Sequence, residues 1–130
     1  MGYTTEFSGH FDIFPTPTAK FINQVNEFAD TRHGGNLDVY PGFPGFWCNW
    51  TVQPVASDAD GELQYGLAWN GTEKFYRYTE WLQYLIDNFF APQGYSLNGD
   101  VNWQGEDDLD TGIITVNGNQ IEVTTIEDMM

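Results

Sequence analysis

Apolar and polar residues alternate in four segments of the chain, the pattern of strands that bury one face. In the first, Phe7, Phe11 and Ile13 alternate with polar side chains. The four segments cover residues 6–13, 46–53, 62–69 and 95–104. Each of them predicts a strand with one side turned toward a core.

Two other segments have helical spacing. The first follows Thr16-Pro17, which reads as an N-cap with proline at the first helical position, and it ends before Gly34-Gly35. Its apolar residues are Phe21, Ile22, Val25, Phe28 and Ala29. They predict a helix over 17–32.

The second helical segment follows a variant capping box from Asn70 to Glu73 and stops at Pro92 and Gly94. Its apolar stripe consists of Tyr78, Leu82, Leu85, Ile86 and Phe89, with Phe75 before it. This stripe predicts a helix over 72–90.

Turn-forming residues separate these elements. Residues 34–45 are rich in glycine and proline and predict a loop, while Asp58-Ala59-Asp60-Gly61 suits a tight turn between two antiparallel strands. Asn117-Gly118 predicts a type I′ hairpin between strands at 113–116 and 121–125.

The resulting order predicts an α+β two-layer sandwich, in which two helices cover one face of an antiparallel sheet. The first six elements have the ferredoxin-like βαββαβ arrangement, and a C-terminal β-hairpin follows them. We expect a single domain over residues 1–130, a common domain size. The other face of the sheet is expected to remain open to solvent.

The distribution of charged residues indicates what kind of partner the open face could bind. The chain has a formal net charge of -15, and its four basic residues all fall inside the predicted helices: Lys20, Arg32, Lys74 and Arg77. The open face is therefore expected to carry an unopposed negative field that favours a basic partner. The same sign disfavours direct binding of nucleic acid and of anionic membranes, and no stretch of the sequence is apolar over the length needed to span a bilayer.

Motifs for chemistry are weak. Cys48 is the single cysteine and is expected to be an inert core thiol in a reducing, cytoplasmic setting. His10 is expected on the surface, and His33 near the end of a helix. Nineteen acidic residues offer many carboxylate pairs without selecting one for a hydrolase.

The connection from Gly105 to Gly112 contains four carboxylates, which are ligands that calcium or magnesium prefer. Its spacing matches no EF-hand loop, and acidic turns are usually only solvated. We therefore predict no cofactor and no catalytic residue, with a divalent cation at this loop as the alternative.

Tryptophans divide into two groups. Four lie on or near apolar stripes and are expected in the core: Trp50, Trp69, Trp81 and Trp103. Trp47 is expected on the open face, where an isolated aromatic resembles an interface anchor. The residues predicted to contact a partner are Glu6, Asp12, Trp47, Glu62, Asp100, Glu106, Asp107, Asp108 and Asp110.

Two stretches carry a resemblance. They are Phe46-Trp47-Cys48-Asn49-Trp50 and the run EKFYRYTEWLQYLIDNFFAPQGYSLNGDVNWQGEDDLDTGIITV from Glu73 to Val116. Together they resemble a group of small uncharacterised bacteriophage and prophage proteins. The resemblance implies a phage context and assigns no functional residue.

In that context the sequence favours a non-enzymatic inhibitor, which occupies a basic nucleic-acid-binding site of a host or defence protein. A DNA mimic of the anti-restriction or anti-CRISPR kind, monomeric or homodimeric, is an example. Alternatives are a virion or replication-associated assembly protein, or a small hydrolase or carbohydrate-binding module. A further alternative is that the acidity serves only solubility.

Overall fold

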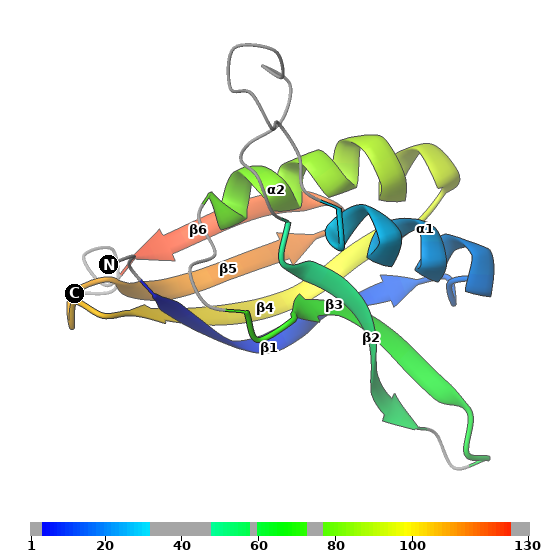
Figure 1. Cartoon of the computed structure of the whole chain (residues 1–130), viewed down its shortest axis with the longest axis horizontal. Coiled ribbons are helices and arrows are strands. Elements are labelled where there is room, and N and C mark those ends of the chain that lie inside the picture. Colours follow the sequence, from blue (N-terminus) through cyan, green and yellow to red (C-terminus); the bar gives the residue numbers. More distant parts are fainter. Residues whose placement is uncertain (1–3, 32–47, 58–59, 73–76, 126–130) are drawn as a thin grey trace.

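An antiparallel sheet organises the molecule. The computed structural model describes residues 4–31, 48–57, 60–72 and 77–125, and within them six strands follow the order β2-β3-β1-β4-β5-β6 (Figure 1). In chain order the strands are β1 Thr5–Phe14, β2 Trp50–Ser57, β3 Leu63–Trp69, β4 Ser96–Gly105, β5 Thr111–Asn117 and β6 Gln120–Thr125.

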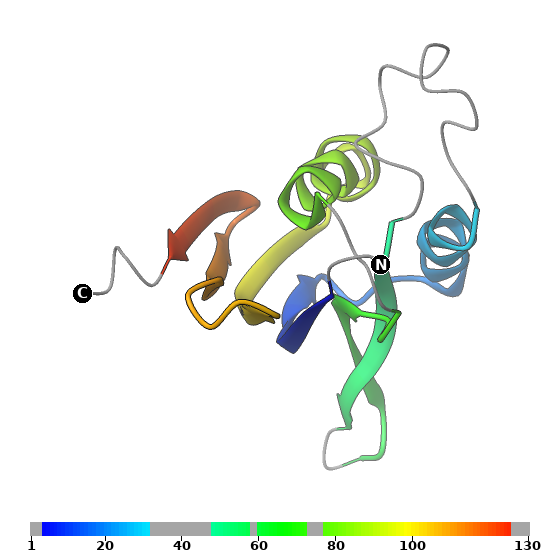
Figure 2. The same ribbon diagram turned by 60° about the vertical axis from the view of Figure 1, so that its left-hand side comes forward.

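Helices cover one face of this sheet (Figures 1 and 2). They are α1 Ala19–Ala29 and α2 Tyr78–Leu85, and α2 continues through a π-helical turn, η1 Ile86–Phe90, into a 3₁₀ turn, η2 Ala91–Gln93. No helix in these ranges is long and apolar enough to cross a membrane. The predicted α+β class is confirmed, with the βαββαβ elements forming β4-β1-β3-β2 and the C-terminal hairpin extending the sheet beside β4.

The core lies between the helices and the inward side of the strands. Trp50 and Trp81 are fully buried, and Trp103 is nearly so, as predicted, while Trp69 is half-buried against the same core. Phe7 on β1 contacts Trp50 edge-on, with ring centroids 5.4 Å apart. These large rings fill the two-layer space and fix the distance between helices and sheet.

The first helix begins two residues later than the sequence predicted. Its N-cap is Thr18, not Thr16, because the Thr18 Oγ1 accepts a hydrogen bond of 3.1 Å from the Phe21 backbone N–H. Pro17 precedes the cap and is buried. The helix ends at Ala29, with Asp30 as its C-cap, so Arg32 and His33 lie beyond it and outside the described residues.

The start of the second helix also differs. Asn70 does not cap it: its Oδ1 accepts a 2.9 Å hydrogen bond from the Thr72 N–H and closes a local turn. The α-helix begins at Tyr78, and Arg77 occupies the N-cap position in the left-handed conformation. The prediction for Glu73, Lys74 and Phe75 falls outside the described residues, while Gly94 ends the helical segment as predicted.

The last hairpin is confirmed with its turn shifted by one residue. Asn117 and Gln120 form the closing pair, so the two central residues are Gly118 and Asn119, both with positive φ as a type I′ turn requires. Asn119 holds the turn against the start of β4, because its Oδ1 accepts from the Leu97 N–H at 2.7 Å. The β2–β3 hairpin is also antiparallel, as predicted.

Candidate functional site

The face of the sheet opposite the helices, called here the open face, exposes the alternate polar residues of β1 and β4. Strand register places His10 opposite Asp100, Asp100 opposite Thr115, and Thr115 opposite Glu122. These four residues form one row across β1, β4, β5 and β6. His10 Nε2 also lies 3.0 Å from the Asp12 Oδ1 on the same strand. The predicted outward orientation of Glu6, Asp12 and Asp100 is confirmed, because all three are exposed.

None of the six strands contains Lys or Arg. The cations of the described chain are Lys20 in α1 and Arg77 at the start of α2, both on elements of the helical layer. Side chains on alternate residues of a strand are about 7 Å apart, so the row and its neighbours combine carboxylates with amides and hydroxyls at regular spacing. The open face is therefore an acidic, hydrogen-bonding surface.

The connection between β4 and β5 is an ordered acidic loop. Asp107 Oδ1 accepts a 2.9 Å hydrogen bond from the Leu109 N–H, and Glu106 Oε1 accepts one of 3.1 Å from the Thr4 N–H. Asp108 is exposed beside Leu109, which is 73% exposed. The loop therefore holds an apolar side chain between acidic neighbours.

Asp110 differs from the other acids of this loop. It is half-buried, and its Oδ1 accepts a 3.0 Å hydrogen bond from the indole Nε1 of Trp103. The Thr111 hydroxyl beside it donates to the Trp103 carbonyl at 2.8 Å. Asp110 thus anchors a core tryptophan, a role that its position in a run of acids did not indicate.

The predicted contact residues do not form one patch. Glu62 is exposed just before β3, and the start of β3 lies far from the β4–β5 loop (Figures 1 and 2). Trp47 lies outside the described residues. The structure thus brings together Glu6, Asp12 and Asp100 on the open face and places Glu106, Asp107 and Asp108 at the end of β4.

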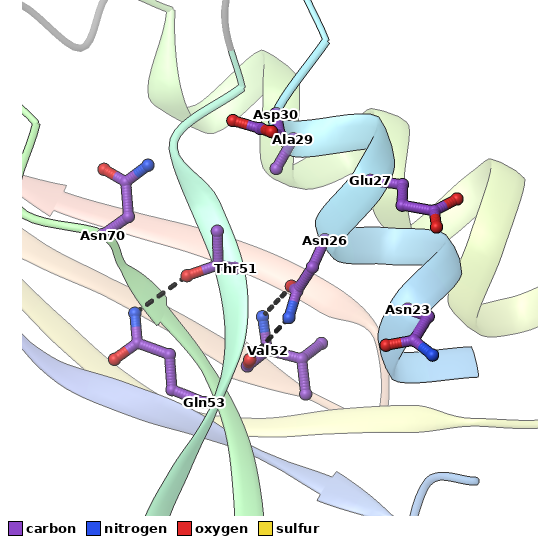
Figure 3. Close-up of a pocket in the computed structure, with 9 residues that line it drawn as sticks. All are labelled: Asn23, Asn26, Glu27, Ala29, Asp30, Thr51, Val52, Gln53 and Asn70. Carbon is purple, nitrogen blue, oxygen red and sulfur yellow. Dashed lines mark hydrogen bonds between the residues drawn. The ribbon is translucent and has the colours of Figure 1, made fainter. Parts of the chain in front are cut away.

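A pocket of about 530 Å³, lined mostly by residues with polar side chains, lies between α1 and the edge strand β2 (Figure 3). Its lining residues are Asn23, Asn26, Glu27, Ala29, Asp30, Thr51, Val52, Gln53 and Asn70. Asn26 already uses both ends of its amide: Nδ2 donates to the Val52 carbonyl at 3.0 Å, and Oδ1 accepts from the Val52 N–H at 2.8 Å. This side chain therefore imitates a neighbouring strand and closes the outer edge of β2. Sequence reasoning missed it, since Asn23 and Asn26 look alike in the helical pattern.

No group of three or more His, Cys, Asp and Glu within the described ranges is placed to hold a metal ion. In the β4–β5 loop, Asp110 is turned to Trp103 and Glu106 to the Thr4 backbone. These two carboxylates thus point to separate protein partners.

Cys48 is fully buried next to the start of β2, in agreement with the predicted core thiol. Burial raises the pKa of this thiol from 9.0 to about 12, against a smaller lowering by its contact with the Trp50 carbonyl. We expect a disulfide reagent to label the folded protein at least about tenfold more slowly than the unfolded protein, because the thiolate is the nucleophile. Labelling at equal rates would show that the thiol is accessible.

The same pKa difference gives a pH dependence with a defined sign. Between pH 9.0 and about 12 the unfolded chain releases the Cys48 proton while the folded chain keeps it, so this contribution to stability is present below pH 9.0 and is lost as the pH rises through that window. Urea unfolding of the wild type and of Cys48→Ala across this range measures it. The two slopes against pH should differ, and identical slopes would contradict the assignment.

Comparison with known proteins adds no assignment. The chain matches no protein-family model, no curated protein and no solved structure. The resemblance to phage proteins therefore stays a prediction.

Proposed function

We propose that this protein is a non-enzymatic, phage-type acidic binding protein, an inhibitor or DNA mimic that occupies the basic nucleic-acid-binding site of a host or defence protein. The observation that carries the proposal is the segregation of charge: the row His10, Asp100, Thr115 and Glu122 crosses four strands, and no strand of the sheet contains Lys or Arg.

The chemistry of the open face suits such a partner. Lysine and arginine side chains that hold phosphates also bind carboxylates, arginine often in bidentate geometry. Asparagine, glutamine and threonine side chains lie between the carboxylates, and they offer further acceptors to the same cations. A basic groove would thus find both charge and hydrogen-bond partners on one surface.

Exposure of the carboxylates supports a binding role over a hydrolytic one. A hydrolase with two carboxylates holds one of them in an apolar, buried setting so that it can act as an acid. Glu6, Asp12, Asp100, Asp108 and Glu122 are all exposed, which suits contact with a protein surface.

The first test uses neutral variants on each layer. The triple variant Asp100→Asn, Asp108→Asn, Glu122→Gln removes three exposed charges from the open face and the β4–β5 loop. The matched control, Glu27→Gln, Asp30→Asn, Glu80→Gln, removes three exposed charges from the helical layer. We expect the first to weaken binding to a partner isolated from bacterial lysate by roughly tenfold or more, and the control to change it by less than about threefold.

Salt and nucleic acid complete this test. Raising the salt from about 0.01 M to about 0.1 M shortens the Debye length from about 30 Å to about 10 Å, and binding should weaken steeply over that range. Duplex DNA should displace the protein from its partner. Binding that is insensitive to salt, or a partner that holds DNA and this protein together, would overturn the proposal.

A further inference from the structure

The two edges of the sheet are built differently. At the β2 edge, the Asn26 amide of α1 bonds both backbone groups of Val52, and β2 itself contains Pro54 and a register shift between Pro54 and Ala56. Proline, an irregular register and a covering element are devices by which proteins prevent further strand pairing at an edge. This edge is closed.

The β6 edge has none of these devices. Its sequence, Gln120 to Thr125, contains no proline, lysine or arginine, and it pairs with β5 without interruption from Asn117↔Gln120 to Gly112↔Thr125. In the described part of the chain, β6 is the last strand of the sheet, and no element covers its outer side (Figure 2).

Hydrogen-bond alternation gives the direction of the backbone groups along β6. Asn117 and Gln120 close a two-residue hairpin and therefore bond each other, and every second pair along the ladder does the same. Glu122 and Thr124 thus bond β5. The N–H and C=O groups of Ile121 and Val123 point away from the sheet.

Side chains along β6 alternate in chemistry as well. Ile121 pairs with the buried Val116 and packs against the core from the helical side. Val123 follows on that side and is 40% exposed, which leaves an apolar side chain at the margin of the core. Glu122 lies on the open face, at the end of the row that contains Asp100.

We propose that the β6 edge receives an extended segment of a basic partner as an added strand. The segment would alternate apolar residues, set beside Ile121 and Val123, with Lys or Arg, set beside Glu122. Main-chain bonds to an edge strand supply affinity in this mode, and alternate side chains supply selectivity. The inference rests on the proposed function, because it names how the basic partner would dock.

Charge favours such a segment over a second copy of this chain. Two copies would each bring a net charge of -15, and pairing β6 with itself would bring the Glu122 side chains of both copies to the same face. Like charges at neighbouring strand positions are destabilising, whereas a lysine in the added strand would pair with Glu122.

The test uses a defined peptide, acetyl-Val-Lys-Val-Lys-Val-Lys-Val-amide, with Lys-Val-Val-Lys-Val-Val-Lys as the control of equal composition without alternation. Fluorescence anisotropy measures affinity, and NMR hydrogen exchange follows the amides of Ile121 and Val123. We expect the alternating peptide to bind at least about tenfold more tightly and to slow exchange at those two amides.

Variants of the protein separate backbone pairing from charge. Val123→Pro removes an outward donor and blocks pairing, and Val123→Thr keeps the donor. We expect a loss of about tenfold or more for Val123→Pro and little change for Val123→Thr. Glu122→Lys should also weaken binding, while Glu27→Lys on α1 makes the same charge change beside the opposite edge and should have little effect. If Val123→Pro fails to fold, a peptide with N-methylated backbone positions tests pairing on the wild type, and it should not bind.

Three results would overturn the inference. In the first, a folded Val123→Pro variant binds the peptide with wild-type affinity while Glu122→Lys binds it more weakly. Charge alone would then attract the peptide, and the proposed function would survive. Equal affinity for both peptides would exclude strand addition. Protection of Ile121 and Val123 in the free protein, with a dimer that Val123→Pro dissociates, would place a second copy at this edge. None of these measurements uses the natural partner, so they stand apart from the salt test of the proposed function.

Discussion

Replacing Trp50 by alanine is expected to lower the free energy of unfolding by roughly 3–5 kcal/mol, the cost typical of removing a large aromatic from a core. Trp50 is fully buried, and its ring meets Phe7 and Phe11 at centroid distances of 5.4 and 5.8 Å. Its Nε1 donates a 2.8 Å hydrogen bond to the Tyr78 carbonyl at the start of α2. The residue therefore joins β1, β2 and α2.

Chemical denaturation monitored by circular dichroism measures this effect. Trp50→Phe keeps most of the apolar volume but leaves the Tyr78 carbonyl without that donor, and it should cost about 1–3 kcal/mol. Leu63→Ala removes a side chain that is 49% exposed, and it should lower the free energy of unfolding by much less than either Trp50 variant. Because whole domains are stable by only about 5–15 kcal/mol, a Trp50→Ala variant as stable as Leu63→Ala would contradict the described core.

Replacing Gly112 by alanine is the second large effect, with an expected loss of about 3 kcal/mol in stability. Gly112 lies opposite Trp103 on β4, and the indole ring extends over the glycine. An added Cβ would overlap both the Trp103 ring and the Thr124 carbonyl oxygen of β6. The backbone of β6 would have to move, and the Trp103 hydrogen bond to Asp110 would be strained with it.

A matched glycine separates steric overlap from backbone effects. Gly71 has a φ of +87°, and a Cβ added there would meet no neighbouring atom. Gly71→Ala therefore tests only the left-handed conformation and should lower the free energy of unfolding by about 1 kcal/mol. Equal losses at the two glycines would show that Trp103 does not extend over Gly112. Near-ultraviolet circular dichroism should change for Gly112→Ala, because the environment of Trp103 changes.

Alternation predicted β1 and β4 well because each of these two strands has a single buried side. Phe7, Phe11, Leu97 and Val101 are buried as that pattern required, and the order of elements then allowed few arrangements. The helix starts were less predictable because several local signals compete within a few residues. Thr18 outcompetes Thr16 as the N-cap, and its position is supported by a long-range contact: the Thr18 N–H donates to the Tyr95 hydroxyl at 3.3 Å.

The start of the second helix was also predicted wrongly, because Asn70 can form more than one local hydrogen bond. The side chain of asparagine bonds nearby backbone in turns as readily as at helix starts, and here it closes a turn that Trp69 also holds, through a 3.0 Å bond from its Nε1 to the Thr72 carbonyl. The packing of Trp69 against the core places its indole N–H beside the Thr72 carbonyl and so favours the turn. Such a tertiary contact is not visible in a local pattern.

The candidate site was predicted in part. Alternation correctly placed Glu6, Asp12 and Asp100 outward, since it depends only on which side of a strand is buried. It did not separate Asp110 from its acidic neighbours, because the bond to Trp103 requires the β4–β5 register. The sequence also did not predict that, within the described residues, the β2 edge is covered and the β6 edge is not. This difference depends on strand order and on which asparagine of α1 reaches Val52.

The pair of hydrogen bonds between the Asn26 side chain and the Val52 backbone has a consequence for stoichiometry. A polymer that grows by strand pairing requires two free sheet edges on every subunit, because each subunit must pair with a neighbour on both sides. Here the Asn26 side chain of α1 occupies the β2 edge at Val52, so the described part of the sheet can form only one such junction per molecule, at β6. Complexes formed in this way end after a single step, and the protein should stay a discrete species, without fibrils, even at high concentration.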